Sequence, residues 1–232
     1  MRVLSRVLLG ILVIGLVLGC GGKKSGIEGK VVDGKGQPLS GLTIIAKQVQ
    51  PIKGYEQFET KTGSDGTFRF KGLFATSEYA IFPSSEKWKA SVKITLQSGP
   101  EGKTIMLPSP ITIRFTISND GIINDSKLVE LQWAPAPDQS MNWFQANDYA
   151  RNLILGGGGW RLPTRAELKS IYDESNPGGV DPVFHISENW VWTSEDSDAS
   201  SAWYFLYGYG VYWYYGDTSL APSRVLAVRP RN

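Results

Sequence analysis

The chain has 232 residues, 41% of them hydrophobic and 20% charged, with a formal net charge of +2. This length fits one or two domains with a sizeable core. Cys20 is the single cysteine and His185 the single histidine, which excludes an intrachain disulfide, a zinc ribbon and an iron–sulfur centre. The 26 glycines, 13 prolines and many aromatic residues favour short strands and turns over long helices.

The first twenty residues have the pattern of a secretion signal. Arg2 and Arg6 flank the start of the segment, and the apolar run 7–18 that follows is too short to span a bilayer comfortably. The ending Leu16-Val17-Leu18-Gly19-Cys20 resembles a bacterial lipobox, which implies cleavage before Cys20 and a lipid on its sulfur. An uncleaved anchor helix with an incidental cysteine is the alternative.

Residues 21–26 follow as a predicted flexible tether of small and basic residues. By analogy with lipoprotein sorting, Gly21 implies delivery to the outer membrane of the cell envelope. Without the signal, 22 basic residues balance 22 acidic ones, so no global field attracts nucleic acid. The balance is uneven, because residues 27–107 have a net charge of +3 and residues 108–232 one of −5.

Residues 27–107 contain short β-rich runs separated by turn signals such as Asp33-Gly34 and Asp65-Gly66. About seven strands at this spacing predict a small all-β sandwich domain. Asp65 is interpreted as a turn residue that accepts backbone hydrogen bonds, rather than as a catalytic acid. The runs are 27–32, 42–47, 57–61, 67–71, 79–82, 90–96 and 103–107.

Two segments of this region carry a resemblance to a known family. Residues 29–44 and the run Thr62-Gly63-Ser64-Asp65-Gly66-Thr67-Phe68 through Leu73 resemble the carboxypeptidase regulatory-like (transthyretin-like) module. The resemblance implies a spacer or adhesion element without catalytic residues.

In residues 108–232, a β run at 111–117 is followed by two helical patterns. Asn142 and Thr164 are predicted N-caps, and Gln145 and Glu167 complete a capping box three residues later in each case. The second helix should end before the Asn176-Pro177 turn signal, and strands and turns should follow His185. The apolar faces are Trp143, Ala146, Ala150 and Leu153 in the first helix, and Leu168, Ile171 and Tyr172 in the second.

The run Trp160-Arg161-Leu162-Pro163 entering the second helix resembles the signature of the Lcl C-terminal domain family. Further matching segments are 120–125, 131–133, 142–146, 191–194, 202–204 and 227–230. The resemblance implies an α+β C-type-lectin-like domain over 108–232 and glycan or matrix binding at a bacterial envelope. Trp160 and Arg161 themselves are interpreted as structural, with Arg161 holding nearby carbonyls or a carboxylate.

The segment 203–215 is rich in aromatic residues. A two-residue turn at Tyr209-Gly210 would place Phe205 opposite Tyr214 and Leu206 opposite Trp213, and both faces of the hairpin would then be apolar. A bulged loop is the alternative to this turn, because tyrosine is unfavourable at positive φ. Either both faces are buried, or one of them is an exposed binding surface.

The Lcl resemblance implies that one of these faces, with Trp203, Phe205, Tyr207, Tyr212 and Tyr214, is core. The other face is the predicted ligand surface, because aromatic rings suit the C–H faces of sugars. Packing against the other domain or a loop is the alternative for this face. The predicted ligand-binding residues are Tyr204, Trp213 and Tyr215, with Tyr209 at the rim.

Glu195, Asp196, Asp198 and Asp217 supply oxygen ligands from which a calcium site could be built, although their spacing matches no EF-hand. A solvated acidic loop is the favoured interpretation, so no cofactor is predicted. His185 is interpreted as a packed or capping residue rather than a catalytic base. A carboxylate pair of an unrecognised hydrolase stays open, since spatial proximity is invisible in the sequence.

These observations predict a non-catalytic, lipid-anchored envelope protein that presents a lectin-like domain. A sulfated glycosaminoglycan would need a basic surface, whereas residues 108–232 are acidic, so a neutral glycan or a protein is the expected partner. The alternative is a structural interaction module whose aromatic face packs permanently on an envelope protein.

Overall fold

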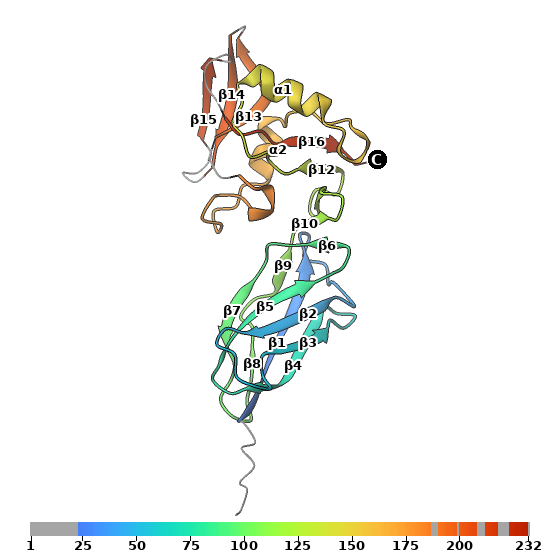
Figure 1. Cartoon of the computed structure of the whole chain (residues 1–232), viewed down its shortest axis with the longest axis vertical. Helices are drawn as coiled ribbons and strands as arrows, with labels where there is room; N and C mark the ends of the chain where they lie inside the picture. Colours follow the sequence, from blue (N-terminus) through green and yellow to red (C-terminus); the bar gives the residue numbers. More distant parts are fainter. Residues whose placement is uncertain (1–22, 187–189, 199, 208–211, 218–222, 232) are drawn as a thin grey trace, which may run out of the picture.

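A computed structural model describes residues 23–186, 190–198, 200–207, 212–217 and 223–231, with the backbone alone for 197, 198 and 212–217. Cys20, the predicted signal and Tyr209 lie outside the described residues. The described chain forms a β-rich unit at the end where the N-terminus lies, and a mixed α and β unit stacked above it (Figure 1). No helix within the described residues has the length and apolarity needed to cross a membrane.

The first unit is a β-sandwich, as predicted. One sheet has the order β4-β1-β8 with β9 also paired to β1, and the other has the order β3-β2-β5-β7. Ile27, Ile44, Phe70 and Tyr79 fill the space between them and are at most 2% exposed. The strands are β1 (Lys24–Asp33), β2 (Thr43–Gln48), β3 (Gln57–Lys61), β4 (Thr67–Phe74), β5 (Glu78–Ser84), β7 (Ile94–Gln97), β8 (Thr104–Met106) and β9 (Ile111–Ile113).

The turn before β4 also follows the sequence interpretation. Asp65 Oδ1 accepts hydrogen bonds from the backbone N–H of Thr67 at 3.0 Å and from its hydroxyl at 2.7 Å. These bonds lower the pKa of Asp65. The carboxylate is therefore occupied in shaping the turn.

The first strand begins earlier than predicted, inside the segment 21–26 expected to be a tether. Lys24 pairs with Phe74, and the Gly26 N–H donates to Lys103 O at 3.0 Å. A Cβ at Gly26 would lie 2.7 Å from Thr104 Oγ1, so glycine permits the close approach of the neighbouring strand. Residues 21–23 alone separate Cys20 from the first strand.

One predicted strand is shortened and another is divided, and the two units are joined at these places. The run 90–96 is a strand only from Ile94, where β7 begins, and the short strand β6 (Trp88–Lys89) before it pairs with β10 (Phe115–Ser118) of the second unit. The run 111–117 breaks at Arg114, whose guanidinium bonds both carboxylate oxygens of the buried Asp125. As a result β9 pairs with the sandwich and β10 with the second unit.

The second unit has a sheet covered by a helix on each face. Successive residues of its strands alternate between two cores: Trp133 and Val228 lie in the cluster with α2, and Ala134 and Ala227 in the cluster with α1. The larger sheet has the order β16-β12-β11-β10-β6, with β11 (Ile123–Asp125), β12 (Leu131–Ala134) and β16 (Ala227–Pro230). The smaller sheet has the order β13-β14-β15, with β13 (Trp190–Asp198), β14 (Ser201–Leu206) and β15 (Tyr212–Asp217). The helices are α1 (Trp143–Asn152) and α2 (Arg165–Ser170).

Both predicted capping boxes are present. Asn142 Oδ1 accepts from the Gln145 N–H at 2.9 Å, and Gln145 Oε1 accepts from the Asn142 N–H at 3.1 Å. Thr164 and Glu167 exchange the equivalent bonds at the start of α2. The predicted apolar faces point inward: all seven residues are buried or packed against a core cluster, and α2 ends at Ser170, before the Asn176-Pro177 turn.

Candidate functional site

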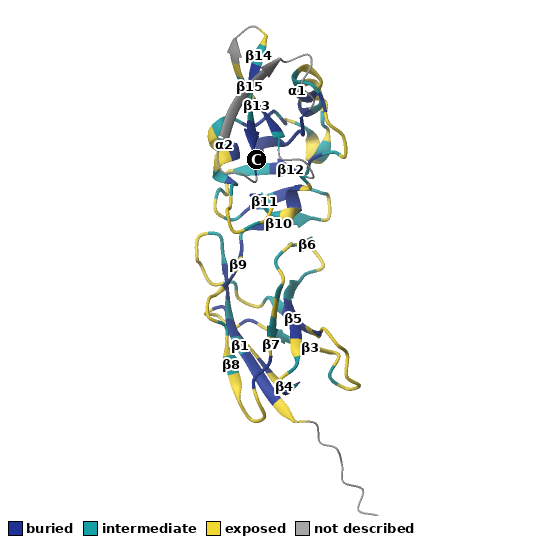
Figure 2. Ribbon diagram, turned by 90° about the vertical axis from the view of Figure 1, so that its left-hand side faces the viewer, coloured by how far each residue is buried: buried dark blue, intermediate teal, exposed yellow. Residues whose placement is uncertain are grey.

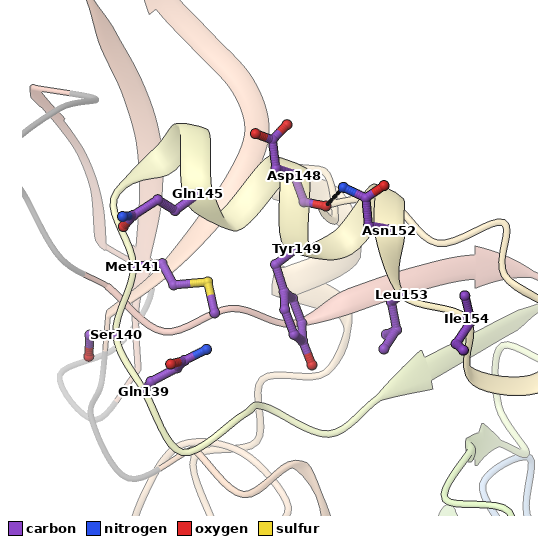
Figure 3. Close-up of a pocket in the computed structure, with 9 residues that line it drawn as sticks. All are labelled: Gln139, Ser140, Met141, Gln145, Asp148, Tyr149, Asn152, Leu153 and Ile154. Carbon is purple, nitrogen blue, oxygen red and sulfur yellow. Dashed lines mark hydrogen bonds between the residues drawn. The ribbon is translucent and has the colours of Figure 1, made fainter.

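A groove of about 640 Å³ runs beside α1 (Figure 3). It lies between the helix and the segment 139–141 that precedes it. Tyr149, Met141 and Leu153 form its apolar surface, and exposed amide, hydroxyl and carboxyl side chains surround them. The lining residues are Gln139, Ser140, Met141, Gln145, Asp148, Tyr149, Asn152, Leu153 and Ile154.

The wall opposite the helix is fixed by backbone bonds. Met141 exchanges two hydrogen bonds of 2.9 Å with Ser223, and Met141 O accepts from Trp192 Nε1 at 2.8 Å. On the other side, the capping box fixes the start of α1, and Ala146 and Ala150 bury its inner face completely. The groove is therefore preformed, and ligand binding would not have to order it.

Tyr149 is the central aromatic side chain of the groove. Its ring is half-buried, and in Figure 3 its hydroxyl points toward the segment before α1. Burial raises the pKa of Tyr149 above its usual value of 10.0. The hydroxyl is therefore protonated at neutral pH, and it can both donate and accept a hydrogen bond.

The rim of the groove is polar and includes the carboxylate of Asp148. Asp148 is exposed and points away from the segment 139–141 in Figure 3. Asn152 Nδ2 donates to Asp148 O at 2.9 Å, and Gln145 Oε1 accepts from the Asn142 N–H in the capping box. The other polar atoms of these two amides, Asn152 Oδ1 and Gln145 Nε2, are the ones that could bond a ligand. Among the described residues that line the groove there is no lysine or arginine. Its chemistry suits an uncharged ligand with hydroxyl groups.

The predicted register of the aromatic hairpin is wrong by one residue. Phe205 pairs with Trp213 and Leu206 with Tyr212, where the two-residue turn would have paired Leu206 with Trp213. The observed register leaves residues 207–211 between the strands. A two-residue turn requires positive φ, which is unfavourable for tyrosine, so the residue type at 209 already disfavours the predicted turn.

This register separates the predicted ligand residues. Trp213 and Tyr215 occupy positions opposite Phe205 and Trp203, whereas Tyr204 belongs to the alternate set of β14. Directly paired residues share one face of an antiparallel sheet, so the three positions do not form one platform.

The described side chains of β14 are packed on both sides. Tyr204 is half-buried, with its ring edge-on to Trp190 at 4.9 Å and to Trp192 at 5.5 Å between ring centroids. Phe205 and Tyr207 are fully buried in the other core, as predicted for these two residues. Tyr212 and Tyr214, predicted for the same face, pair instead with Leu206 and Tyr204 and so occupy positions on the opposite face. On one face of β14 the side chains of Phe205 and Tyr207 are thus buried, whereas Tyr204 on the other face is packed against two rings and partly exposed.

Trp160 and Arg161 are structural, as predicted. Trp160 is 3% exposed, and its Nε1 donates to Leu155 O at 2.7 Å. Arg161 forms a two-pronged ion pair with Glu167 and also donates to Leu162 O. The run thus connects the glycine-rich turn to α2.

No group of three or more histidine, cysteine or acidic side chains is gathered as a metal site in the described part of the chain. Asp196 is exposed. Ser201 in the middle strand β14 pairs with Asp198 of β13 on one side and with Asp217 of β15 on the other. The side chains of Asp198 and Asp217 lie outside the described residues. Glu195 binds Arg165, accepting from its backbone N–H at 2.8 Å and from its Nε at 2.5 Å.

His185 ends a short 3-10 helix, Pro182–Phe184, as its C-cap residue, with a φ of 56°. It is exposed, which agrees with the capping interpretation and not with the packed one.

The sequence interpretation missed the groove. Tyr149 borders the apolar stripe of α1 next to Ala150, and an aromatic residue at the edge of such a stripe is the signal that could have indicated it. Gln139 and Met141 come from the preceding segment, and nothing in the sequence brings that segment beside Tyr149.

Comparison with family models supports both resemblances found in the sequence. Residues 26–107 match the carboxypeptidase regulatory-like domain, and residues 121–229 match the Lcl C-terminal domain. No curated protein is similar enough to the chain to count as a match. The segment 108–120, with the crossing strands β9 and β10, lies between the two matches. The two matches follow one another along the chain in the order that the sequence resemblances predict.

Proposed function

We propose that this protein is a non-catalytic, lipid-anchored protein of the cell envelope that binds a neutral glycan through the groove beside α1. The observation that carries the proposal is the composition of the groove: the Tyr149 ring and Met141 form an apolar surface, and amide groups surround it. A sugar ring can place its C–H face on the aromatic ring while its hydroxyls bond the amides.

The domain combination supports the same proposal. The Lcl C-terminal match and the arrangement of two helices around a sheet agree with a C-type-lectin-like fold. The lipobox-like ending at Cys20 supports a lipid anchor and delivery to the outer membrane. The sandwich then serves as the spacer between the anchor and the binding unit.

The proposal is tested by titrating the detergent-purified full-length chain with neutral and sulfated polysaccharides and following tryptophan fluorescence. Trp192 donates to the Met141 carbonyl in the wall of the groove and reports on it. We expect saturable binding of a neutral polysaccharide, at least tenfold weaker in Tyr149→Ala, since losing one stacking platform costs about 1.4 kcal/mol or more. Phe144→Ala is the matched control, because Phe144 is 52% exposed on the same helix and does not line the groove.

Other results would change the proposal. Binding lost in Trp213→Ala/Tyr215→Ala, but kept in Tyr149→Ala, would place the site at β15. Binding of sulfated polysaccharides alone would contradict the neutral ligand. Absence of any polysaccharide binding, together with a protein that co-purifies in stoichiometric amount, would favour the alternative, an interaction module for an envelope partner.

A further inference from the structure

We propose that the end of the β-sandwich where β1 begins is a docking surface for an anionic lipid membrane. We call it the basal surface; it comprises residues 23–26, 47–57, 71–79 and 97–104. The inference rests on the proposed lipid anchor at Cys20 and deepens it, because an acyl anchor by itself requires no contact between the folded chain and the lipid headgroups.

Only a short segment separates Cys20 from the first strand, which begins at this end of the sandwich. Lys24 already pairs with Phe74, so four residue steps lead from Cys20 to the first strand. An extended chain covers at most about 3.5 Å per step, or about 14 Å in total. A lipid on Cys20 would therefore hold the basal surface within reach of the headgroups.

Hydrogen bonds gather three other segments around the start of β1. Ala75 N donates to Lys23 O at 2.7 Å, and Gly102 N donates to Lys24 O at 2.8 Å. Val49 N donates to Glu78 O at 2.9 Å, which ties the loop between β2 and β3 to the same end. The surface therefore consists of segments held together by backbone bonds.

The loop between β2 and β3 presents apolar side chains to solvent. Val49 is 46% exposed and Ile52 36%, and Pro51 between them is exposed as well. The loop is folded by its own bonds: Gln48 Oε1 accepts from Ile52 N at 2.8 Å, and Tyr55 N donates to Ile52 O at 2.8 Å. Because the backbone is already ordered, these side chains can enter the headgroup region without a folding cost.

The basal surface is also basic. Six lysines against three glutamates give it a net charge of +3, whereas residues 108–232 have one of −5. All six lysines are exposed, and Figure 2 shows exposed residues where the chain enters the sandwich. Anionic headgroups attract such lysines and repel the acidic second unit, so the electrostatic potential of the membrane favours an orientation with the basal surface facing the lipid. The lysines are Lys23, Lys24, Lys47, Lys53, Lys71 and Lys103, and the glutamates are Glu56, Glu78 and Glu101.

The test uses the full-length chain, purified with its own N-terminus and reconstituted into vesicles of phosphatidylcholine with or without phosphatidylglycerol. Amide hydrogen exchange is measured for residues 49–56, with detergent micelles as the reference. We expect exchange about tenfold slower in the vesicles with phosphatidylglycerol than in phosphatidylcholine alone, and a loss of this protection in 0.5 M salt, where the Debye length is only about 4 Å.

Variants separate surface contact from a change in fold. Val49→Ser/Ile52→Ser should lose most of the protection, whereas Val129→Ser should keep it, because Val129 is exposed to a similar extent, 42%, in the second unit. Lys53→Gln/Lys103→Gln should lose the dependence on phosphatidylglycerol. Both pairs are on the surface, so unfolding curves in detergent should match the unsubstituted chain.

The two proposals fail in different ways. If the chain washes off the vesicles, the lipid anchor is wrong and the docking proposal fails with it. If the chain stays on the vesicles and residues 49–56 exchange equally fast in both lipids and in micelles, the anchor stands and the docking surface is wrong. Equal protection in both lipids would also overturn the proposed preference for anionic headgroups.

Discussion

Arg161 and Glu167 form a two-pronged ion pair, with 2.8 Å between Nη1 and Oε2 and 2.7 Å between Nη2 and Oε1. The same carboxylate accepts from the Thr164 N–H at 2.7 Å and completes the capping box of α2. One side chain thus fixes the start of the helix and attaches it to the run Trp160-Arg161-Leu162-Pro163.

Replacing Glu167 should destabilise the protein in a pH-dependent way. Burial alone would raise the pKa of Glu167, but the hydrogen bonds from Arg161 and Thr164 outweigh burial and lower it below the usual 4.5. A lowered pKa in the folded state gives stability that is present above the unfolded pKa and is lost as the pH falls through the folded one. We expect Glu167→Gln to cost about 1–2 kcal/mol at pH 7.

Urea unfolding at pH 7 and at pH 3 measures this cost. The difference between Glu167→Gln and the unsubstituted chain should shrink at pH 3, and the exposed Glu174 provides the control substitution Glu174→Gln. A difference of the same size at both pH values would show that the ionised carboxylate does not supply the stability.

Substituting alanine for Gly156 and for Gly157 in turn would separate the cost of backbone strain from the cost of a steric clash. Both have positive φ, 55° and 95°. A Cβ at Gly156 would lie 2.5 Å from Ile122 Cδ1 and 2.7 Å from Arg229 Nη2, whereas a Cβ at Gly157 would meet nothing within 4 Å. We expect Gly157→Ala to cost about 1 kcal/mol through strain alone and Gly156→Ala about 3 kcal/mol. Thermal unfolding checks this order, and equal costs would mean that the turn moves to admit the methyl group.

Two fully buried tryptophans should respond differently to the same substitution. Trp192 Nε1 donates to Met141 O at 2.8 Å, whereas Trp133 Nε1 has no hydrogen-bond partner among the described residues. Trp→Phe removes similar volume at both sites, but only at Trp192 does it also remove a hydrogen bond, which leaves Met141 O with the bond from the Ser223 N–H. We expect Trp192→Phe to cost about 1 kcal/mol more than Trp133→Phe in denaturant unfolding. The reverse order would indicate that Trp133 Nε1 is hydrogen-bonded in solution.

Much of the fold could be predicted from the sequence, because many of its features depend on residues that are close together in the chain. The capping boxes at Asn142 and Thr164 depend on residues three positions apart, and the turn at Asp65 on residues two apart, so each forms within its own segment. The apolar stripes follow the period of the helix in the same way. The structural role of Arg161 could also be predicted from the sequence, because its partner Glu167 lies only six residues further along the chain.

Tertiary structure decided the features that depend on distant segments. The register at Phe205 and Trp213 differs by one residue between a two-residue turn and a longer connection, and one residue exchanges the faces of a strand. Likewise, the pairing of β6 with β10 and the bond of Glu195 with Arg165 join residues about 30 positions apart.

The candidate site shows the same division. The sequence by itself determined that α1 forms, and therefore that Tyr149 lies at the edge of its buried face. Only the tertiary structure placed Met141 and Gln139 beside that ring, because the bonds of Met141 to Ser223 and Trp192 cross more than fifty residues of chain. A groove is a property of two surfaces, and a local pattern can specify one of them alone.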